Sequence, residues 1–397
     1  MSEDGALVAQ RQAQDGITLA NWRQAPWNRQ AFRNIAALLP VARIVGDPGR
    51  STSLPRATLD LGAVTFAAPD GRRLSVADLL RETATDGFIV LRNGAIAYEW
   101  YEAGFGPDMP HIVFSVSKSI SALLAGNLVE NGTLDPDAPV TAYIPEAAGS
   151  AYGDCTVRHV LDMTVSIDFA EQYLDTTGAF ARYRVATGWN PVTDPALDVG
   201  LHQFLVTLRR DRQRHGERFY YVSPNSDMLG WIIERAGGKP FAQLLSEQVW
   251  QPMGALTDAY VTIDKNGAAR SAGGICASTH DLARLGELVR RGGKIDGRQI
   301  LSHAWLDDIR RNGDRNAWLA SDSAKFLPNG RYRSQWYLIG NAHESYCAIG
   351  IHGQWIYIDP KAEMVIVKLS SQALPVEDQT DRLLLSGFAA IGQALSP

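Results

Sequence analysis

The sequence predicts an α/β fold in which an antiparallel sheet is flanked by helices and a mainly α-helical part is inserted into it. Two observations lead to this prediction. Runs rich in β-branched and aromatic residues occur at 88–101 and again at 346–370, whereas the chain between them is mostly of helical periodicity. Because these runs lie towards opposite ends of the chain, we expect one sheet to be assembled from both.

The length of the chain predicts two lobes. Its 397 residues exceed the roughly 250–300 residues at which single hydrophobic cores stop growing. We assign residues 1–113 and 290–397 to the α/β part and residues 114–289 to the mainly helical part. Residues 1–85 are punctuated by Pro and Gly, and their structure is not predicted.

Local signals place the individual elements. Asn93-Gly94, the dipeptide that favours a tight type I′ turn, divides residues 88–101 into two strands of a hairpin. Residues 114–132 carry apolar side chains at helical spacing and end at Gly132. The same patterns predict further helices at 156–163, 226–238, 279–293 and 379–394, and further strands at 346–351, 354–359 and 364–370.

Composition excludes several classes of protein. The chain has 38 basic and 43 acidic residues, a net charge of −5 and no Lys/Arg-rich block, so no nucleic-acid partner is expected. No apolar run approaches the roughly 18 residues of a membrane span, and no secretory leader is visible, which predicts no membrane association and a cytoplasmic location. Cysteines and histidines lack metal-ligand spacing and no nucleotide-binding glycine motif occurs, so neither metal nor cofactor is expected.

Ser115 and Lys118 form the first candidate catalytic pair. Of the seven lysines, only Lys118 has a serine three residues before it. Residues at i and i+3 share one face of a helix, so the lysine amine can reach the serine hydroxyl. A structural alternative stays open at this point, because S-x-x-K is short and Ser115 could simply cap the helix beside a surface lysine. Ser117 and Ser119 point to other faces of the helix.

A proton donor for the leaving group is sought among the tyrosines. Tyr221-Val222-Ser223 lies in a loop before an apolar helix, whereas Tyr332-Arg333-Ser334 lies in a polar stretch typical of an exposed loop edge. We therefore favour Tyr221, with a buried structural tyrosine as the alternative. G-x-S-x-G is absent, and His352 is interpreted as a structural residue beside the site.

Together these motifs resemble a known superfamily. Ser115-x-x-Lys118 followed by Tyr221-Val222-Ser223 is similar to the class C-like branch of the serine β-lactamases and penicillin-binding proteins. Blocks at 131–146, 156–168 and 278–294 resemble that branch in the same order. FSVSKS, YVSPNSD, GIHGQ and VIVKLSS resemble the family of 6-aminohexanoate-dimer (nylon-oligomer) hydrolases and their carboxylesterase relatives.

The resemblance implies a β-lactamase/transpeptidase-like fold with the active site between its two parts. It implies Ser115 as the nucleophile, Lys118 as its base and Tyr221 as the proton relay. The backbone N–H groups of Ser115 and Ile351 would form the oxyanion hole. The resemblance also allows a homodimer.

Departures from the family pattern concern the substrate. The β-lactamase K-T-G triplet is replaced by Ala348-Ile349-Gly350, which removes the cation that meets a β-lactam carboxylate. Arg184 stands where the family carries an aspartate for the substrate's amine, so strong activity on the aminohexanoate dimer is not expected. The residues that the resemblance places at the substrate are Tyr173, Arg184, Trp189, Ser223 and Ala272.

The sequence therefore predicts a serine hydrolase that forms an acyl-enzyme. Its expected substrates are small-molecule carboxylic esters with short acyl groups and, by extension, linear amides such as 6-aminohexanoate oligomers. A β-lactamase or D,D-peptidase is the alternative among enzymes. A catalytically silent, penicillin-binding-like ligand sensor is the alternative of another class, and the retained Ser115, Lys118 and Tyr221 count against it.

Overall fold

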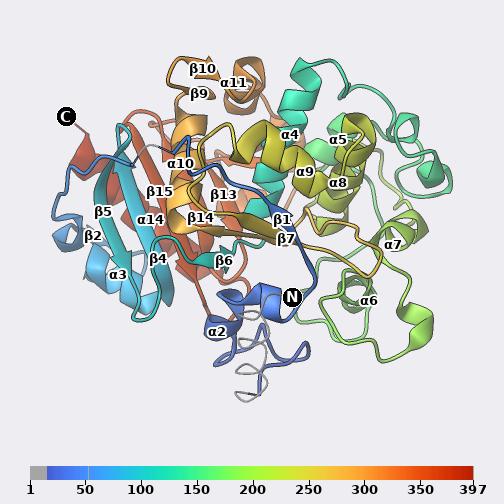
Figure 1. The fold of residues 1–397 in the computed structure, drawn as a ribbon, viewed down its shortest axis with the longest axis horizontal. Helices are drawn as coiled ribbons and strands as arrows, with labels where there is room; N and C mark the ends of the chain where they lie inside the picture. The colour runs from blue at the N-terminus through green and yellow to red at the C-terminus, as the bar shows by residue number, and fades with distance from the viewer. Residues whose placement is uncertain (1–15, 52, 397) are drawn as a thin grey trace.

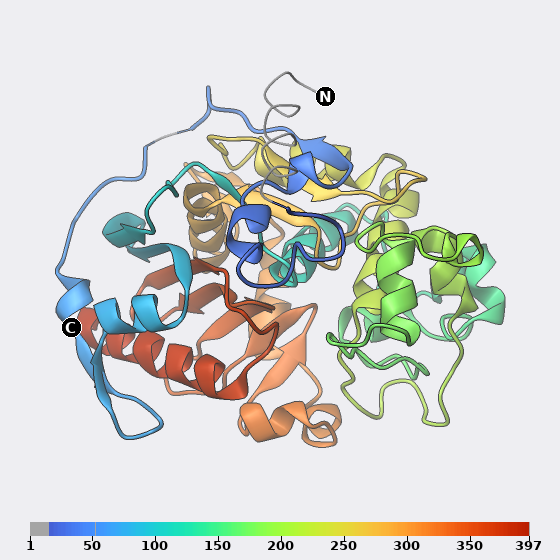
Figure 2. The same ribbon diagram turned by 90° about the horizontal axis from the view of Figure 1, so that it is seen from below.

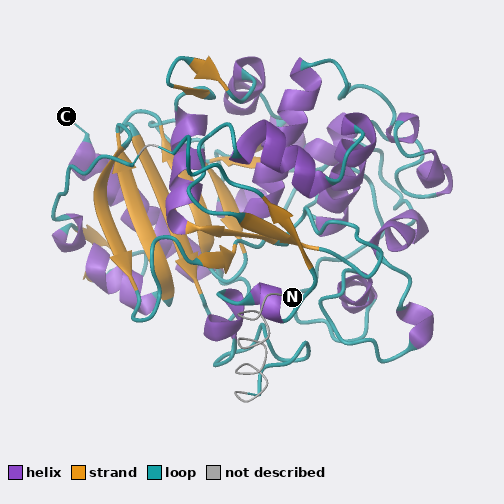
Figure 3. Ribbon diagram, in the orientation of Figure 1, coloured by secondary structure: helices purple, strands orange, loops and turns teal. Residues whose placement is uncertain are grey.

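The largest sheet has seven antiparallel strands drawn from both ends of the chain, as predicted (Figures 1 and 3). The computed structural model describes residues 16–51 and 53–396. In pairing order, the strands are β11 (Arg331–Arg333), β12 (Trp336–Leu338), β13 (Tyr346–Gly350), β14 (Gln354–Asp359), β15 (Met364–Ser370), β4 (Thr85–Arg92) and β5 (Ala95–Tyr101).

Helices cover both faces of this sheet. Side chains alternate along a strand, so Ile89 and Leu91 of β4 join the core that contains helix α10 (Thr279–Arg290). Phe88 and Val90 join the separate core that contains helix α14 (Asp378–Leu395). Figures 1 and 2 show these two helices on opposite sides of the sheet. The result is a three-layer arrangement in which both faces of the sheet are buried.

The predicted hairpin is confirmed. Strands β4 and β5 pair antiparallel on either side of Asn93 and Gly94. Both turn residues have positive φ angles, 47° and 81°, as a type I′ turn requires.

A second, four-stranded sheet was not predicted. Its strands, in pairing order, are β1 (Val41–Ile44), β7 (Ala259–Thr262), β8 (Ile275–Ser278) and β6 (Pro110–Ile112). They have only three or four residues each, too few to show a reliable alternation. Two short hairpins complete the strands of the described chain, namely β2 (Thr65–Ala67) with β3 (Arg73–Ser75) and β9 (Lys294–Ile295) with β10 (Arg298–Gln299).

The remaining α-helices lie mainly between the two groups of strand-forming segments. None of the described helices is long and apolar enough to cross a bilayer. They are α2 (Asn28–Phe32), α3 (Val76–Glu82), α4 (Val116–Glu130), α5 (Val157–Leu161), α6 (Ala179–Ala186), α7 (Leu201–Thr207), α8 (Ser223–Gly237), α9 (Phe241–Leu245), α11 (His303–Arg311), α12 (Arg315–Leu319) and α13 (Ser323–Phe326).

Several boundaries differ from the predicted ones. Helix α8 begins at Ser223 rather than Ser226, because Pro224 lies in its first turn, where a missing N–H leaves no hydrogen bond unmade. Elements also form in residues 16–85, where none was predicted, among them α3 with its Ser75/Asp78 capping box. Helix α10 packs on the seven-stranded sheet although all but its last residue lie within 114–289. The division into parts by residue range stays a prediction.

Candidate active site

A strained turn directs Ser115 to the start of helix α4. Strand β6 ends at Ile112, and the chain turns at Phe114, whose φ of 43° is unfavourable for a bulky residue. The Phe114 ring is buried against the rings of Trp22, Phe32 and Trp189, and this packing holds the turn. Ser115 follows as the first residue of the helical turn, at the floor of a cavity.

Lys118 points back at Ser115 along the same face of the helix. Its Nζ lies 2.9 Å from Ser115 Oγ and 3.1 Å from Ser223 Oγ, and it donates a hydrogen bond of 2.7 Å to the carbonyl of Ala272. The Ser115 side chain makes no capping hydrogen bond, and Lys118 is only 2% exposed. The alternative reading, a capping serine beside a surface lysine, is therefore wrong.

Burial prepares Lys118 to act as a base. Desolvation lowers the pKa of Lys118 from 10.5 to about 7; Glu171 opposes this shift, and Arg270 adds to it by charge repulsion. The neutral amine, which a general base requires, is therefore accessible at neutral pH. Ser117 and Ser119 lie on other faces, where Ser119 donates to the carbonyl of Gln335 and Ser117 accepts from the amide of Ile275.

Tyr221 lies beside this pair. Lys118 Nζ is 5.0 Å from the centre of its ring, and the Ser115 side chain is near enough to act on the pKa of Tyr221, which it lowers. Burial raises the pKa of Tyr221 well above its usual range, so the side chain stays a phenol at neutral pH. Tyr332 is not at an exposed edge as predicted. It lies on β11, is 3% exposed and packs against Phe219 and Trp318.

The two predicted oxyanion donors meet where α4 approaches the end of β13. Ser115 and Ile351 both line the cavity, and neither backbone amide donates a turn or loop hydrogen bond within the described chain. Gly350 makes this approach possible, because a Cβ there would lie 2.5 Å from the Val113 carbonyl and 3.1 Å from the Ser115 nitrogen.

A carboxylate that the sequence analysis missed holds Ser223 in place. Glu171 Oε1 accepts the Ser223 hydroxyl at 2.5 Å, and Oε2 accepts the Ser223 amide at 2.8 Å. Ser223 thus joins Glu171 to Lys118. No motif marks Glu171 in the sequence, because it stands in an irregular loop 52 residues before its partner.

A buried ion pair, also missed, positions the backbone that Lys118 contacts. Asp227 of α8 pairs with Arg270, and its other oxygen accepts the amide of Ala272 at 2.8 Å. The carbonyl of Ala272 is the group that Lys118 binds. Asp227 therefore acts on the site through the main chain.

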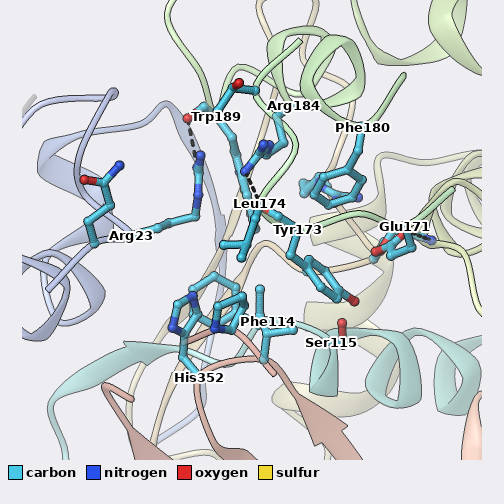
Figure 4. Close-up of a pocket in the computed structure, with 18 of the residues that line it drawn as sticks. Arg23, Phe114, Ser115, Glu171, Tyr173, Leu174, Phe180, Arg184, Trp189 and His352 are labelled. Atoms are coloured by element: carbon cyan, nitrogen blue, oxygen red, sulfur yellow. Dashed lines mark hydrogen bonds between the residues drawn. The ribbon is translucent and has the colours of Figure 1, made fainter. Parts of the chain in front are cut away.

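The predicted substrate residues line one cavity of about 240 Å³ beside Ser115. Figure 4 shows Tyr173 with its hydroxyl towards Ser115 and Arg184 farther along the cavity. Arg184 donates to the carbonyls of Tyr173 and Asp175, so it also holds the Tyr173 loop. The Trp189 indole donates to Thr262 Oγ1 at 3.0 Å, which fixes its ring as a wall. Ser223 and Ala272 lie at the Lys118 end.

His352 also borders this cavity. Its Nδ1 is 2.7 Å from the carbonyl of Gln372, and burial lowers its pKa to about 4. A neutral imidazole held on the main chain agrees with the structural interpretation of this residue.

A second cavity, of about 430 Å³, meets the first at Ser115. Tyr221 borders the second cavity and is not among the residues that line the first. Its charged lining residues are Asp322, Lys325, Asp378 and Asp381, of which Lys325 and Asp322 form an ion pair. Ser115 thus lies where two cavities with different linings meet.

Comparison with known proteins places this geometry in a family. A model of the Beta-lactamase family matches residues 60–390. The 6-aminohexanoate-dimer hydrolase of Paenarthrobacter ureafaciens is 38% identical over 356 residues, which cover 89% of this chain and 88% of that protein. Esterase EstB of Burkholderia gladioli is 30% identical over 230 residues, which cover 54% of this chain and 56% of the esterase.

Solved structures share the fold. A Bacillus anthracis protein that carries the provisional name 6-aminohexanoate-dimer hydrolase superposes with a TM-score of 0.88 at 25% identity, covering 96% of this chain and 97% of that one. A family VIII carboxylesterase superposes with a TM-score of 0.58 at 16% identity, covering 79% and 96%. The predicted β-lactamase/transpeptidase-like fold is therefore confirmed. The chain belongs to the Beta-lactamase family and is a serine hydrolase.

Proposed function

We propose that the protein hydrolyses small carboxylic esters with short acyl groups, and linear amides such as 6-aminohexanoate oligomers more slowly, through an acyl-enzyme on Ser115. The observation that carries the proposal is the buried Lys118 amine 2.9 Å from Ser115 Oγ, with a pKa of about 7. A neutral amine at hydrogen-bond distance can accept the hydroxyl proton as the oxygen attacks.

The first half-reaction forms the acyl-enzyme. Ser115 Oγ bonds to the carbonyl carbon while its proton passes to Lys118 Nζ, and the carbonyl oxygen becomes an oxyanion. The amides of Ser115 and Ile351 stabilise that charge, with roughly 3–4 kcal/mol from each donor. The bond to the leaving group then breaks, and the leaving oxygen or nitrogen receives a proton.

Tyr221 suits the delivery of that proton. Its raised pKa keeps the phenol protonated. Because Tyr221 lies beside Ser115 and Lys118, it can give its proton to the leaving atom and regain one from Lys118. In the second half-reaction, water attacks the acyl carbon and gives one proton to the Lys118 and Tyr221 pair, which returns that proton to the Ser115 oxygen as it leaves. The opposite pKa shifts of the two groups support the assignment of Lys118 as base and Tyr221 as donor.

Replacement of Ser115 by alanine tests the proposal. Turnover of p-nitrophenyl acetate and butyrate should fall to the uncatalysed rate, and a fluorophosphonate probe should no longer label the protein. Ser119→Ala is the matched control, because Ser119 lies on another face of the same helix and should still allow labelling at Ser115. Unchanged ester hydrolysis by Ser115→Ala would refute the assignment.

The same assays separate the alternatives. A ligand sensor would show neither turnover nor labelling in the unaltered protein. A β-lactamase would hydrolyse nitrocefin at a rate comparable to its ester turnover. The end of β13, Ala348-Ile349-Gly350, offers no side-chain cation there, which favours the esterase.

A further inference from the structure

The cavity beside Ser115 contains an excess of positive charge. Its charged lining residues are three arginines, Arg23, Arg184 and Arg270, and one carboxylate, Glu171. Both oxygens of Glu171 already accept hydrogen bonds from Ser223. Arg270 is paired with Asp227, but neither Arg23 nor Arg184 forms an ion pair within the described chain.

The two unpaired arginines are held by neutral acceptors only. Arg23 donates to the carbonyl of Trp189 and the side chain of Asn190, and Arg184 donates to two loop carbonyls. Among the residues that the structure describes, the buried Nε of Arg184 has no hydrogen-bond partner. Figure 4 shows both guanidinium groups at the end of the cavity away from Ser115. Both guanidinium groups thus line the cavity without a carboxylate in salt-bridge contact among the described residues.

The electrostatics of Arg23 agree with this arrangement. Burial, and in addition repulsion from Arg184 and Arg270, lowers the pKa of Arg23 to about 9. Cations that repel one another in a partly desolvated cavity gain stability when an anion enters between them. An ammonium group at the same place would be repelled.

The position of Tyr221, the proposed proton donor, indicates which part of a substrate occupies the cavity lined by the arginines. Tyr221 borders the second cavity but does not line the first. Because the donor has to reach the leaving atom, the leaving group lies in the second cavity and the acyl group lies in the first. The aromatic walls formed by Phe114, Phe180 and Trp189 fit the aliphatic portion of such an acyl chain.

We propose that the preferred acyl group ends in a carboxylate, so that the substrates are monoesters and monoamides of dicarboxylic acids. This inference rests on the proposed function, since it assigns the acyl side of the same site. Arg184 and Arg23 bind the distal carboxylate, the aromatic walls hold the methylene chain, and Ser115 attacks the carbonyl at the other end. Neither arginine takes part in bond breaking.

Three p-nitrophenyl esters of similar length test the charge preference. They are the half-ester of adipic acid, its methyl ester, and the ester of 6-aminohexanoic acid, which end in a negative, a neutral and a positive group. After subtraction of spontaneous hydrolysis, kcat/KM should be highest for the half-ester, about tenfold or more above the methyl ester, and lowest for the amino ester.

Substitutions assign the preference to the arginine. Arg184→Gln should reduce the ratio of kcat/KM for half-ester to methyl ester by about tenfold, and Arg184→Lys should retain part of it. Arg182→Gln is the matched control, because Arg182 lies exposed on the same helix α6 and its loss should leave the ratio unchanged. Arg23→Gln should lower the ratio in the same direction as Arg184→Gln.

Each outcome has a separate meaning. If none of the three esters is hydrolysed at a rate that depends on Ser115, the proposed function itself fails. If the methyl ester is hydrolysed through Ser115 but the half-ester is not preferred, only the carboxylate inference fails. If Arg184→Gln lowers kcat/KM for all three esters by one common factor, Arg184 only supports the Tyr173 loop, and the inference is overturned.

Discussion

Replacing Glu171 by glutamine tests whether Lys118 is the base. The carboxylate favours the charged form of Lys118 and so raises its pKa, against the larger lowering by burial. Glutamine has nearly the same shape and can still accept a hydrogen bond from Ser223. The pKa of Lys118 should therefore fall, and the acidic limb of the pH profile of kcat/KM should move to lower pH.

The size of this effect follows from the geometry. Ser223 Oγ is 3.1 Å from Lys118 Nζ and 2.5 Å from Glu171 Oε1, so that carboxylate oxygen lies within about 6 Å of the amine. With an effective dielectric constant of about 20, the attraction is roughly 2–3 kcal/mol. Since one pKa unit corresponds to about 1.4 kcal/mol, the inflection should move by about one to two pH units from its wild-type position near 7.

The assay is kcat/KM for p-nitrophenyl butyrate across the acidic range, for the wild type, Glu171→Gln and a control. Below its inflection the wild type should lose about tenfold in kcat/KM per pH unit. Glu247→Gln is the control, because Glu247 is an exposed carboxylate paired with Lys239. An inflection that stays in place, or moves to higher pH, in Glu171→Gln would refute the role of Lys118 as the titrating base.

Three further predictions concern groups around the nucleophile. Gly350→Ala should lower kcat for p-nitrophenyl butyrate by about a hundredfold, because its Cβ would displace the Ser115 amide from the oxyanion site; an unchanged kcat would contradict this. Lys118→Met should abolish turnover yet raise the free energy of unfolding in urea at pH 7. The pKa of Lys118 is lower in the folded than in the unfolded chain, so the unfolded wild type binds more protons between pH 7 and about 10, and the wild type becomes more stable as the pH rises. The stability advantage of Lys118→Met over the wild type should therefore be about 2 kcal/mol smaller at pH 9 than at pH 7. Asp227→Asn should destabilise the fold by about 3 kcal/mol or more in the same assay, because it leaves Arg270 buried without its counter-charge.

Short-range signals were sufficient where the structure depends on neighbours in the chain. The hairpin at Asn93-Gly94 needs only two residues that tolerate positive φ. The contact between Ser115 and Lys118 needs only one helical turn, so their spacing and the helical pattern of 114–132 were enough to expect it. Strands β13, β14 and β15 carry the β-branched and aromatic residues that identify them in isolation.

The four-stranded sheet could not be predicted from the sequence, because it depends on contacts between distant segments. Its strands are three or four residues long, and their partners are distant in the sequence. Strand β1 pairs with β7 across 215 to 221 residues, and β6 pairs with β8 across 164 to 168 residues. A strand this short has no periodicity of its own, and pairing with a distant partner stabilises it. The burial of Tyr332 was missed because the polar residues beside it in the sequence do not show which face of the strand packs against the core.

The catalytic pair, Ser115 and Lys118, depends on both local and tertiary structure. The sequence by itself determined that Ser115 and Lys118 share a helix face, because helical geometry acts over four residues. Only the tertiary structure decided that the pKa of the amine falls to about 7, because burial against Ser223 of α8 and the 270–272 segment lowers it and the distant Glu171 opposes that shift. Likewise, Arg23, Arg184 and Arg270 lie far apart in the sequence, and only folding gathers their charges into one cavity. Chemistry between neighbours is encoded locally, whereas charge, burial and pocket shape arise from contacts between distant segments.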